Sequence, residues 1–169
     1  LEVRSNMELM KRVRAIRPDA WLVYKPHPDV VAGLRGSGQG EHEAHHHCDE
    51  LLQGGDMHQI LQRVDEVHVI TSLTGFEALL RGKPVHCHGH PFYAGWGLTV
   101  DTQPHARRTR RLALDELVAA VLLAYPTYID PATGSPCEVE EALTVLAARQ
   151  AHAGSHHAWW RKWLRPWLA

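Results

Sequence analysis

The chain has 169 residues, a length typical of a single domain that can enclose a hydrophobic core. Its 18 Lys and Arg against 19 Asp and Glu give a formal net charge of −1, which disfavours nucleic-acid binding through bulk positive charge. The longest apolar run, Leu117 to Tyr125, is too short to cross a bilayer. The three cysteines, Cys48, Cys87 and Cys137, are odd in number and widely spaced, which argues against a disulfide framework and favours a reducing compartment.

The N-terminal part of the chain predicts a helix followed by a strand. Apolar side chains recur at helical spacing over Asn6 to Ile16, with Lys and Arg between them. Trp21 to Tyr24 form a short apolar run typical of a buried strand, which leads into Lys25-Pro26-His27-Pro28-Asp29. Between Val31 and Gly55 the chain is rich in Gly, His and acidic residues, which predicts a surface loop with a short helix over Asp49 to Leu52.

Helices and strands are predicted to alternate in the middle of the chain. Met57 to Arg63 and Gly75 to Arg81 have helical patterns, whereas Glu66 to Ile70 and Pro84 to Cys87 have the patterns of strands. Such an alternation is typical of parallel βαβ units. We therefore predict an α/β fold.

Two further helices are predicted in the C-terminal part, over Leu114 to Tyr125 and over Glu138 to Ala148. A proline-rich turn, Pro126 to Pro136, joins them. Before them, His88 to Arg111 contains turn residues, aromatic residues and a run of arginines, and no regular element is predicted there.

The last residues form a basic tail rich in tryptophan. Trp159, Trp160, Trp163 and Trp167 recur close to helical spacing, with Arg and Lys between them. Two interpretations stay open: an interfacial helix that contacts a membrane or a partner, or a helix that packs its tryptophans on the protein itself. We divide the chain into a domain over residues 1–152 and this tail over residues 153–169. Because the chain begins at Leu1 without a signal-peptide pattern, we expect it to be part of a longer protein.

Hydroxyl residues follow the predicted strand that ends at Ile70. In the segment from Ile70 to Glu77, Thr71, Ser72 and Thr74 stand where a strand gives way to a helix, and free backbone N–H groups there can bind an anion such as phosphate. The alternative is a capping box, with Thr74 as the N-cap and Glu77 at the third helical position. Both can hold, because a capping box uses only some of the free donors.

Lys25-Pro26-His27-Pro28-Asp29 brings a cation and an imidazole to a second strand end. His27 can donate a hydrogen bond to a phosphate or protonate it, because its ordinary pKa lies near physiological pH. The prolines on both sides restrict the backbone. The alternative is a surface turn in which the histidine has no chemical role.

A loop rich in aromatic residues, Pro91 to Thr99, and the arginine run from Arg107 to Arg111 are further candidates. The aromatic rings suit stacking on a sugar or a base, and the alternative is a hydrophobic cluster beneath a loop. The arginines suit a carboxylate or phosphate ligand, and the alternative is a solvated charged face.

Two groups of histidines raise the question of metal binding. Neither group has the spacing of a known zinc site, and the first lies in a Gly-rich loop, so we predict no metal centre. The first group is His42, His45, His46 and His47 with Cys48, and the second, His86, His88 and His90, would share one face of an extended segment.

Six segments, taken together and in this order, resemble the KpsC/LipB family of capsule polysaccharide synthesis and export proteins. They are YKPHPD (Tyr24 to Asp29), TSLTGFEALLRGKPV (Thr71 to Val85), PFYAGWGLT with Asp101 (Pro91 to Thr99), RRTRRL (Arg107 to Leu112), ELVAA (Glu116 to Ala120) and YPTYIDPATGSPCEVE (Tyr125 to Glu140).

The resemblance implies a Rossmann-like parallel sheet flanked by helices, similar to the C-terminal half of a GT-B glycosyltransferase. It implies a retaining β-Kdo transferase that uses CMP-Kdo to build the oligo-Kdo linker on a phosphatidylglycerol-type lipid, at the cytoplasmic face of the inner membrane. The implied partners are the N-terminal half of the same protein and the capsule export machinery, without nucleic acid. Two alternatives stay open: a non-catalytic scaffold for capsule assembly, and a His-rich metal-binding module.

The resemblance also implies roles for particular residues. His27 would engage the phosphate of the donor, and Lys25 would face either that phosphate or the carboxylate of Kdo. The carboxylate nucleophile would come from a segment that precedes this chain. No metal or other cofactor is implied. The implied donor-binding residues are Lys25, His27, Pro28, Ser72, Thr74, Gly75 and Glu77.

Overall fold

The computed structural model describes residues 2–27, 41–103 and 105–152. The chain divides into two compact units, Leu1–Leu117 and Val118–Ala169. Pro28 and the predicted tail over residues 153–169 lie outside the described residues, so the division at residue 152 stays a prediction. Among the described helices, none combines the length and the apolar character that a membrane span requires.

Helix α1 (Asn6–Ile16) has the bounds that the sequence predicts. Ser5 caps its N-terminus, since the Ser5 hydroxyl accepts a hydrogen bond from the Glu8 N–H at 3.2 Å. Met7, Met10 and Val13 are buried along one face of the helix. The apolar repeat in the sequence therefore marks the face of α1 that packs on the rest of the first unit.

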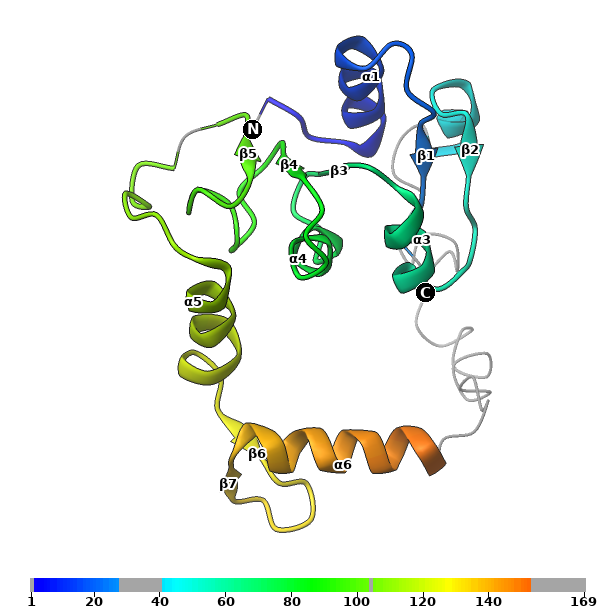
Figure 1. Ribbon diagram of the computed structural model, residues 1–169. Helices are drawn as coiled ribbons and strands as arrows, with labels where there is room; N and C mark the ends of the chain where they lie inside the picture. The colour runs from blue at the N-terminus through cyan, green and yellow to red at the C-terminus, as the bar shows by residue number, and fades with distance from the viewer. Residues whose placement is uncertain (1, 28–40, 104, 153–169) are drawn as a thin grey trace. The chain divides into compact units, whose positions relative to one another are not determined.

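A small two-stranded sheet lies beside α1 (Figure 1). Strand β1 (Val23–Tyr24) pairs in parallel with β2 (Glu50–Leu51), which follows the 3₁₀-helix η1 (Glu41–His46). The prediction of a helix over Asp49 to Leu52 is wrong, because backbone N–H groups of this segment bond to β1, as Leu52 N does to the Tyr24 carbonyl at 2.9 Å. Strand β1 is also shorter than predicted, and Trp21 before it is 73% exposed.

A three-stranded parallel sheet forms the centre of the first unit. After α3 (Met57–Arg63), the order is β3 (Val67–Val69), α4 (Thr74–Leu79), β4 (Val85–Cys87) and β5 (Val100–Asp101), with the strands paired in the order β3-β4-β5. Both pairings are parallel, which confirms the predicted βαβ arrangement. Strand β5 was not predicted, since it has two residues and no apolar pattern of its own.

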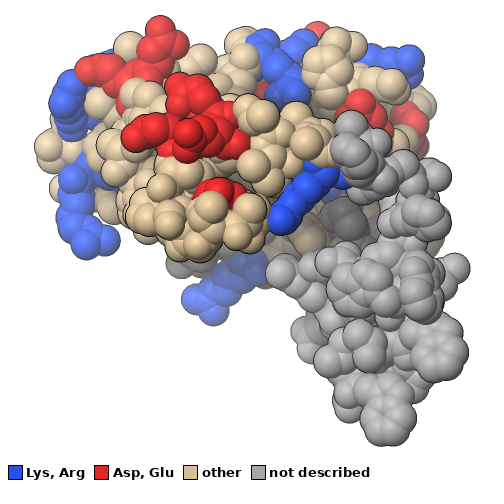
Figure 2. All heavy atoms as spheres, turned by 90° about the horizontal axis from the view of Figure 1, so that it is seen from below, with Lys and Arg blue, Asp and Glu red and all other residues tan. Residues whose placement is uncertain are grey.

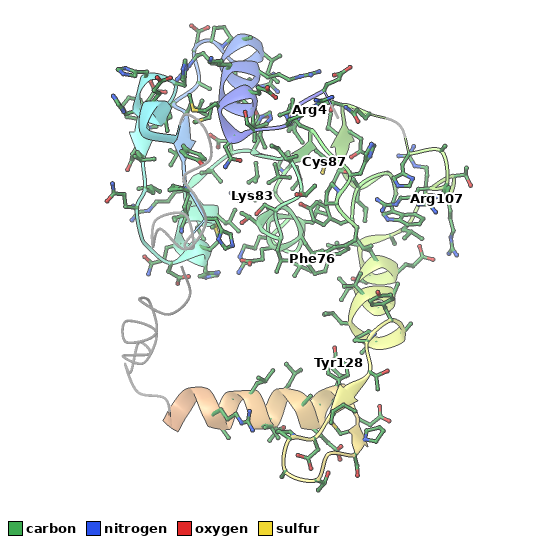
Figure 3. All side chains as sticks on the ribbon, turned by 180° about the vertical axis from the view of Figure 1, so that it is seen from behind. Arg4, Phe76, Lys83, Cys87, Arg107 and Tyr128 are labelled. Atoms are coloured by element: carbon green, nitrogen blue, oxygen red, sulfur yellow. The ribbon has the colours of Figure 1, made fainter. Side chains whose placement is uncertain are left out.

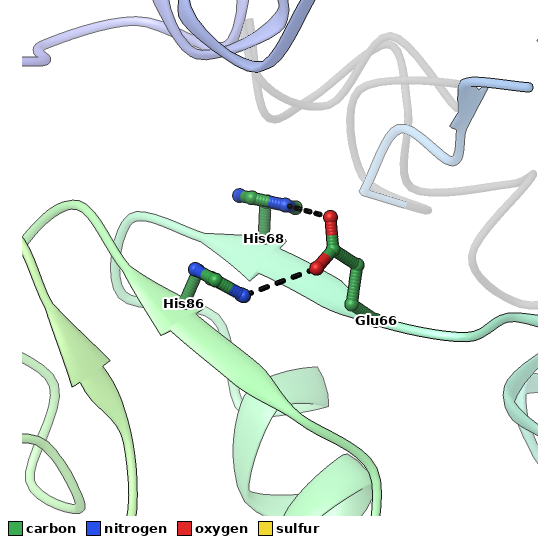
Figure 4. Close-up of side chains that lie close together, drawn as sticks. All are labelled: Glu66, His68 and His86. Atoms are coloured by element: carbon green, nitrogen blue, oxygen red, sulfur yellow. Dashed lines mark hydrogen bonds and ion pairs between the residues drawn. The ribbon is translucent and has the colours of Figure 1, made fainter. Parts of the chain in front are cut away.

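The β3–β4 pair has two chemically different faces. Val69, Val85 and Cys87 are buried on the face that α4 contacts, and we call it the apolar face. Figure 3 labels Cys87 of this face and Phe76 of α4. Successive strand residues point to opposite faces, so His68 and His86 lie on the other side, toward α1 (Figure 4). We call this side, to which Glu66 and His88 also belong, the histidine face.

The second unit is built from helices and a short hairpin. Helix α5 (Leu114–Ala119) leads into it and continues as the π-helical turn η2 (Ala120–Ala124), in which the Tyr125 N–H bonds to the Ala120 carbonyl at 2.9 Å. Strands β6 (Tyr128–Ile129) and β7 (Pro136–Cys137) then pair antiparallel within the predicted proline-rich turn. Helix α6 (Val139–His152) extends four residues beyond its predicted end at Ala148.

Charged side chains of both signs are spread over the surface. On the face drawn in Figure 2, acidic groups lie between separate basic groups. The described residues on that face therefore form no continuous basic surface.

Candidate functional site

The first predicted strand-end loop follows β1. Lys25 is half-buried, Pro26 is buried and His27 is exposed. Pro26 restricts the backbone between the other two residues, because proline limits its own φ and the conformation of the residue before it. The loop therefore presents the imidazole of His27 to solvent at the carboxyl end of β1, where α/β proteins commonly bind ligands.

The second predicted loop follows β3 and forms a compact hydroxyl pair. The Ser72 Oγ donates to the Thr74 Oγ1 at 3.1 Å and accepts from the Thr74 N–H at 3.2 Å. The hydroxyl proton of Thr74 is then directed away from Ser72 and can be donated to a ligand. Two of the three hydroxyl groups that the sequence singles out, those of Ser72 and Thr74, therefore act as one unit.

The alternative of a capping box at this position is wrong. Helix α4 begins with Thr74 itself, its N-cap is Leu73, and no side chain caps it. The Glu77 N–H instead bonds to the Leu73 carbonyl at 3.1 Å. Ser72 lies two residues before Thr74, and its hydroxyl accepts a hydrogen bond from the Thr74 N–H. This bond gives a partner to one N–H of the first helical turn.

Gly75 is required because a tyrosine lies against it. A Cβ atom at this position would stand 2.2 Å from the Tyr93 hydroxyl oxygen and 2.7 Å from its Cζ. The Tyr93 hydroxyl donates to the Ser72 carbonyl, and Tyr93 is fully buried. Burial raises the pKa of Tyr93, so the phenol stays protonated and keeps this hydrogen bond.

Tyr93 is a positioning residue that sequence reasoning missed. It comes from the aromatic loop between β4 and β5, and it fixes the carbonyl of Ser72 beside the hydroxyl pair. In the sequence, its role could have been suggested by a glycine shortly after one strand, Gly75, and a tyrosine in the loop after the next strand. That combination becomes meaningful only when β3 and β4 are known to be neighbours.

The aromatic loop itself is held from two sides. Asp101 on β5 accepts from the Gly95 N–H at 2.8 Å and from the Thr99 hydroxyl at 2.7 Å. Arg108 donates to the carbonyl oxygens of Pro91 and Ala94 at 2.7 and 2.6 Å. These hydrogen bonds hold the loop in one conformation. Tyr93 and Ala94 are buried, as the alternative of a hydrophobic cluster beneath a loop predicts.

The arginine run is divided between structural and exposed members. Arg108 is half-buried, its guanidinium carbon lies 5.4 Å from the centre of the Trp96 ring, and burial lowers its pKa. Arg110 pairs with Glu116 at 2.5 Å, whereas Arg107 is exposed. Arg108 therefore stabilises the aromatic loop. Arg107 is more accessible to a ligand than Arg108.

The structure brings only some of the predicted site residues together. Ser72, Thr74 and Gly75 share one turn, and Glu77 follows them on α4, where it is half-buried. Lys25 and His27 follow β1, which belongs to the other sheet of the first unit. Ser72, Thr74, Gly75 and Glu77 are therefore held together by one turn and the helix that follows it. Among the described strands, no pairing connects them to Lys25 and His27.

A cluster of ionisable groups occupies the histidine face (Figure 4). The His68 Nε2 lies 3.1 Å from one carboxylate oxygen of Glu66, and the His86 Nε2 lies 3.2 Å from the other. The two imidazole rings stack, with centres 4.4 Å apart. On its far side, the His68 Nδ1 lies 3.1 Å from the Nε2 of His88, which is 1% exposed.

Arg17, after α1, completes this cluster. It donates to Glu66 from Nε at 2.8 Å and from Nη2 at 3.1 Å, and these bonds together with the hydrogen bond from His68 lower the pKa of Glu66 to about 2. Burial lowers the pKa of His68 and that of His88, the latter to about 4. At neutral pH the cluster therefore holds an ionised Glu66 carboxylate and neutral imidazoles at His68 and His88.

The sequence singled out only part of this cluster. It placed His86, His88 and His90 on one face, and His86 and His88 do share the histidine face, whereas His90 lies against His105 with ring centres 5.3 Å apart. Glu66 and His68 were missed, although Glu66-Val-His68 alternates like His86-Cys-His88. Only the pairing of His68 with His86 in adjacent strands makes the two segments one group.

The other histidine group lies in and after η1. Ala44 is buried there, and the rings of His45 and His46 lie 3.9 Å apart. Within the part of the chain that the structure describes, the one set of three metal-ligating side chains whose ligand atoms converge is Glu66, His68 and His86.

Comparison with known proteins places these motifs in a family. A profile of the family described as "Capsule polysaccharide biosynthesis protein" matches residues 2–130, which include both strand-end loops and the aromatic loop. The chain belongs to this family. The resemblance to the KpsC/LipB family that the sequence motifs suggest is thereby confirmed.

Curated relatives of this chain are considerably longer. The capsule polysaccharide modification protein LipA of Neisseria meningitidis is 48% identical over 145 residues, which are 86% of this chain and 21% of LipA. The lipopolysaccharide-processing protein LpsZ of Rhizobium meliloti is 43% identical over 143 residues, 85% of this chain and 32% of LpsZ. The chain thus spans between a fifth and a third of these proteins.

Two solved structures have the same fold. The β-Kdo 2,7 transferase of Thermosulfurimonas dismutans KpsC matches with a TM-score of 0.77 and 47% identity, over 88% of this chain and 47% of that one. The β-Kdo 2,4 transferase of the same KpsC matches with a TM-score of 0.74 and 36% identity, over 83% and 44%. These matches confirm the predicted α/β class with parallel strands flanked by helices.

Proposed function

We propose that this chain is the donor-binding part of a capsule-related Kdo glycosyltransferase. The observation that carries the proposal is the match of 88% of the chain to a KpsC β-Kdo transferase at 47% identity. Because the chain spans 47% of that structure, it would supply one half of a GT-B-type module, and the acceptor-side half would come from the rest of the protein.

The donor in this proposal is CMP-Kdo, held by the two strand-end loops. Lys25 offers a cation and His27 an accessible imidazole, which together would neutralise and protonate a departing phosphate. The Ser72–Thr74 hydroxyl pair offers a directed donor. Helix α4 has six residues, so the hydroxyls and the cation would contribute more than a helix dipole.

The remaining donor contacts follow from the same arrangement. Gly75 lets Tyr93 pack against the turn, which keeps the Ser72 hydroxyl in place. Glu77 lies next along α4 and would accept hydrogen bonds from ribose or sugar hydroxyls. Pro28, outside the described residues, would complete the His27-Pro28 motif that the resemblance implies.

In the proposed reaction, the bond between the anomeric carbon of Kdo and the phosphate oxygen breaks, and its electron pair stays with CMP. His27 would supply a proton to that phosphate. Retention of configuration needs two displacements, first by a carboxylate and then by an acceptor hydroxyl that loses its proton. The carboxylate would come from a segment before Leu1, and neutralisation by Lys25 and His27 would make a catalytic metal unnecessary.

The acceptor in this proposal is a phosphatidylglycerol-type lipid that carries Kdo. The protein would work at the cytoplasmic face of the inner membrane, as a peripheral protein associated with the capsule export machinery. Nucleic acid is not among the proposed partners, in keeping with the net charge of −1.

Calorimetric titration with nucleotides tests donor binding. We expect CMP to bind more tightly than UMP or AMP, and His27→Ala to lose most of the CMP affinity. His45→Ala, an exposed histidine in η1, is the matched control and should bind CMP like the parent chain. Equal affinity of His27→Ala and His45→Ala would remove His27 from the site, and absence of CMP binding by the parent chain would favour a non-catalytic scaffold.

A transfer assay tests whether this chain can transfer Kdo without the other half of the GT-B-type module. Incubation of the chain with CMP-Kdo and a Kdo-terminated acceptor, followed by mass spectrometry, should show no extended product, because the nucleophile is missing. Turnover that disappears in Asp29→Asn or Glu77→Gln would show instead that this chain contains its own nucleophile.

A further inference from the structure

The histidine face of the β3–β4 pair is unusual for a parallel sheet. Strands of a parallel sheet covered by helices on both sides are normally apolar on both faces. Here the face toward α1 carries Glu66, His68 and His86, whose side chains are only 25%, 8% and 16% exposed. Burial of ionisable groups costs free energy unless they are paired or bind a metal, so the presence of these three side chains on a covered face calls for an explanation.

The ligand atoms of these three side chains converge. One atom from each of Glu66, His68 and His86 lies within 4.8 Å of the others, and Figure 4 shows both imidazoles directed at the carboxylate. Two imidazole nitrogens and a carboxylate oxygen are a ligand set that proteins use for Zn²⁺. Nitrogen ligands favour a transition metal over Mg²⁺ or Ca²⁺.

Contacts behind the ligands resemble the outer shell of a metal site. The Nδ1 of His68, on the far side from Glu66, is 3.1 Å from the buried His88, so the ring is held in orientation. Two hydrogen bonds from Arg17 fix the plane of the Glu66 carboxylate. Groups already oriented in this way lose little freedom when an ion binds.

We propose that Glu66, His68 and His86 bind one divalent transition-metal ion of the Zn²⁺ class. The ion replaces the two contacts between the imidazoles and the carboxylate, and water completes its coordination. For His68 this requires only that the ring proton sits on Nδ1, where the Nε2 of His88 accepts it.

The site stands apart from the proposed donor site. Glu66 precedes β3, whereas Ser72 and Thr74 follow the same strand at its carboxyl end. The ion would link β3 to β4 and, through Arg17, would tie the end of α1 to the sheet. The role proposed for the ion is therefore to stabilise the packing of β3, β4 and α1.

The test uses the full chain with His45, His46 and His47 changed to alanine, which removes three of the four histidines in and after η1. After removal of metal with a chelator, Co²⁺ is titrated while its visible absorption is recorded, and Zn²⁺ is titrated by calorimetry. We expect one ion per chain, the absorption of a tetrahedral Co²⁺ site, and a higher unfolding temperature with Zn²⁺.

Substitutions in this background locate the ion. His86→Gln and Glu66→Gln should each abolish the Co²⁺ absorption, whereas His90→Gln, the next histidine beyond the cluster, should retain it. His88→Leu, which removes only the support of His68, should weaken Zn²⁺ binding by about tenfold.

Circular dichroism of the metal-free proteins checks folding, and CMP titration of the same samples checks the donor site. Absence of stoichiometric binding in the triple-alanine background, or an unchanged Co²⁺ spectrum in both His86→Gln and Glu66→Gln, would overturn the proposal. CMP affinity should not differ between metal-free and Zn²⁺-loaded protein, so failure of the metal site and failure of donor binding are distinguishable.

Discussion

The two faces of the β3–β4 pair show how one short piece of sheet can be built from opposite kinds of contact. The apolar face packs Val69, Val85 and Cys87 toward α4, where burial of hydrocarbon stabilises the fold. The histidine face holds Glu66 and three imidazoles toward α1, where burial costs free energy unless every polar group has a partner. Residues that alternate along the same strands thus contribute stability on one side and ligand atoms on the other.

Substitution in the core of the apolar face should have the largest effect. Phe76 on α4 is 6% exposed, and its ring lies 5.2 Å from that of Phe92. Phe76→Ala should lower the free energy of unfolding by about 3–5 kcal/mol in a urea titration. Leu80→Ala, at a 46% exposed position after the same helix, is the control and should cost far less. Similar losses in the two variants would contradict the assignment of this core.

Crowding at Gly75 should have the next largest effect. A methyl group there meets the buried Tyr93, so Gly75→Ala should destabilise the chain by about 1–3 kcal/mol. Gly54→Ala provides the comparison, since no atom lies within 4 Å of its Cβ position. In a Tyr93→Phe background the penalty of Gly75→Ala should shrink, because the closest clashing atom is gone. A penalty that does not change would show that the clash lies elsewhere.

The attachment of α1, which lies over the histidine face, should depend on pH. Asp49 accepts from the Leu22 N–H at 2.7 Å and pairs with Arg14 of α1 at 2.5 Å, and these bonds lower the pKa of Asp49. Because the carboxyl titrates at lower pH when folded than when unfolded, its contribution is present above its ordinary pKa of 3.8 and is lost as the pH falls below it.

Urea titrations at several acidic pH values check this contribution. Asp49→Asn should flatten the loss of stability on acidification, whereas Asp19→Asn, at an exposed position in the turn after α1, should keep the slope of the parent chain. Identical slopes for the parent chain and Asp49→Asn would remove Asp49 from the attachment of α1.

Replacement of a buried histidine by an aliphatic residue should have the smallest effect. His88 is 1% exposed, and its Nδ1 has no hydrogen-bond partner among the described residues. In chelator-treated protein, His88→Leu should change the free energy of unfolding by less than about 1 kcal/mol, since it removes an unsatisfied polar atom along with one hydrogen bond. Val85→Ala, on the opposite face of the same segment, should cost more. The reverse order would show that the histidine face contributes more stability than the apolar face.

Local patterns predicted the main elements well where their residues carried a clear period. The bounds of α1 and α3 follow from apolar spacing, and the parallel pairing of β3 with β4 follows from the alternation of helix and strand. Prediction failed for β2 and β5, which have two residues each and are strands because of their neighbours. A segment that short has no pattern of its own, so its conformation is decided by the strand that it pairs with.

The sequence also determined the family, because six motifs in order are specific even where each alone is not. It marked Ser72, Thr74 and Gly75 as one turn, since residues so close along the chain must lie close in space. The contact of Tyr93 with Gly75 and the convergence of Glu66, His68 and His86 were decided only by the tertiary structure. Residues on separate strands become neighbours through register, and register depends on the packing of the whole sheet rather than on any one segment.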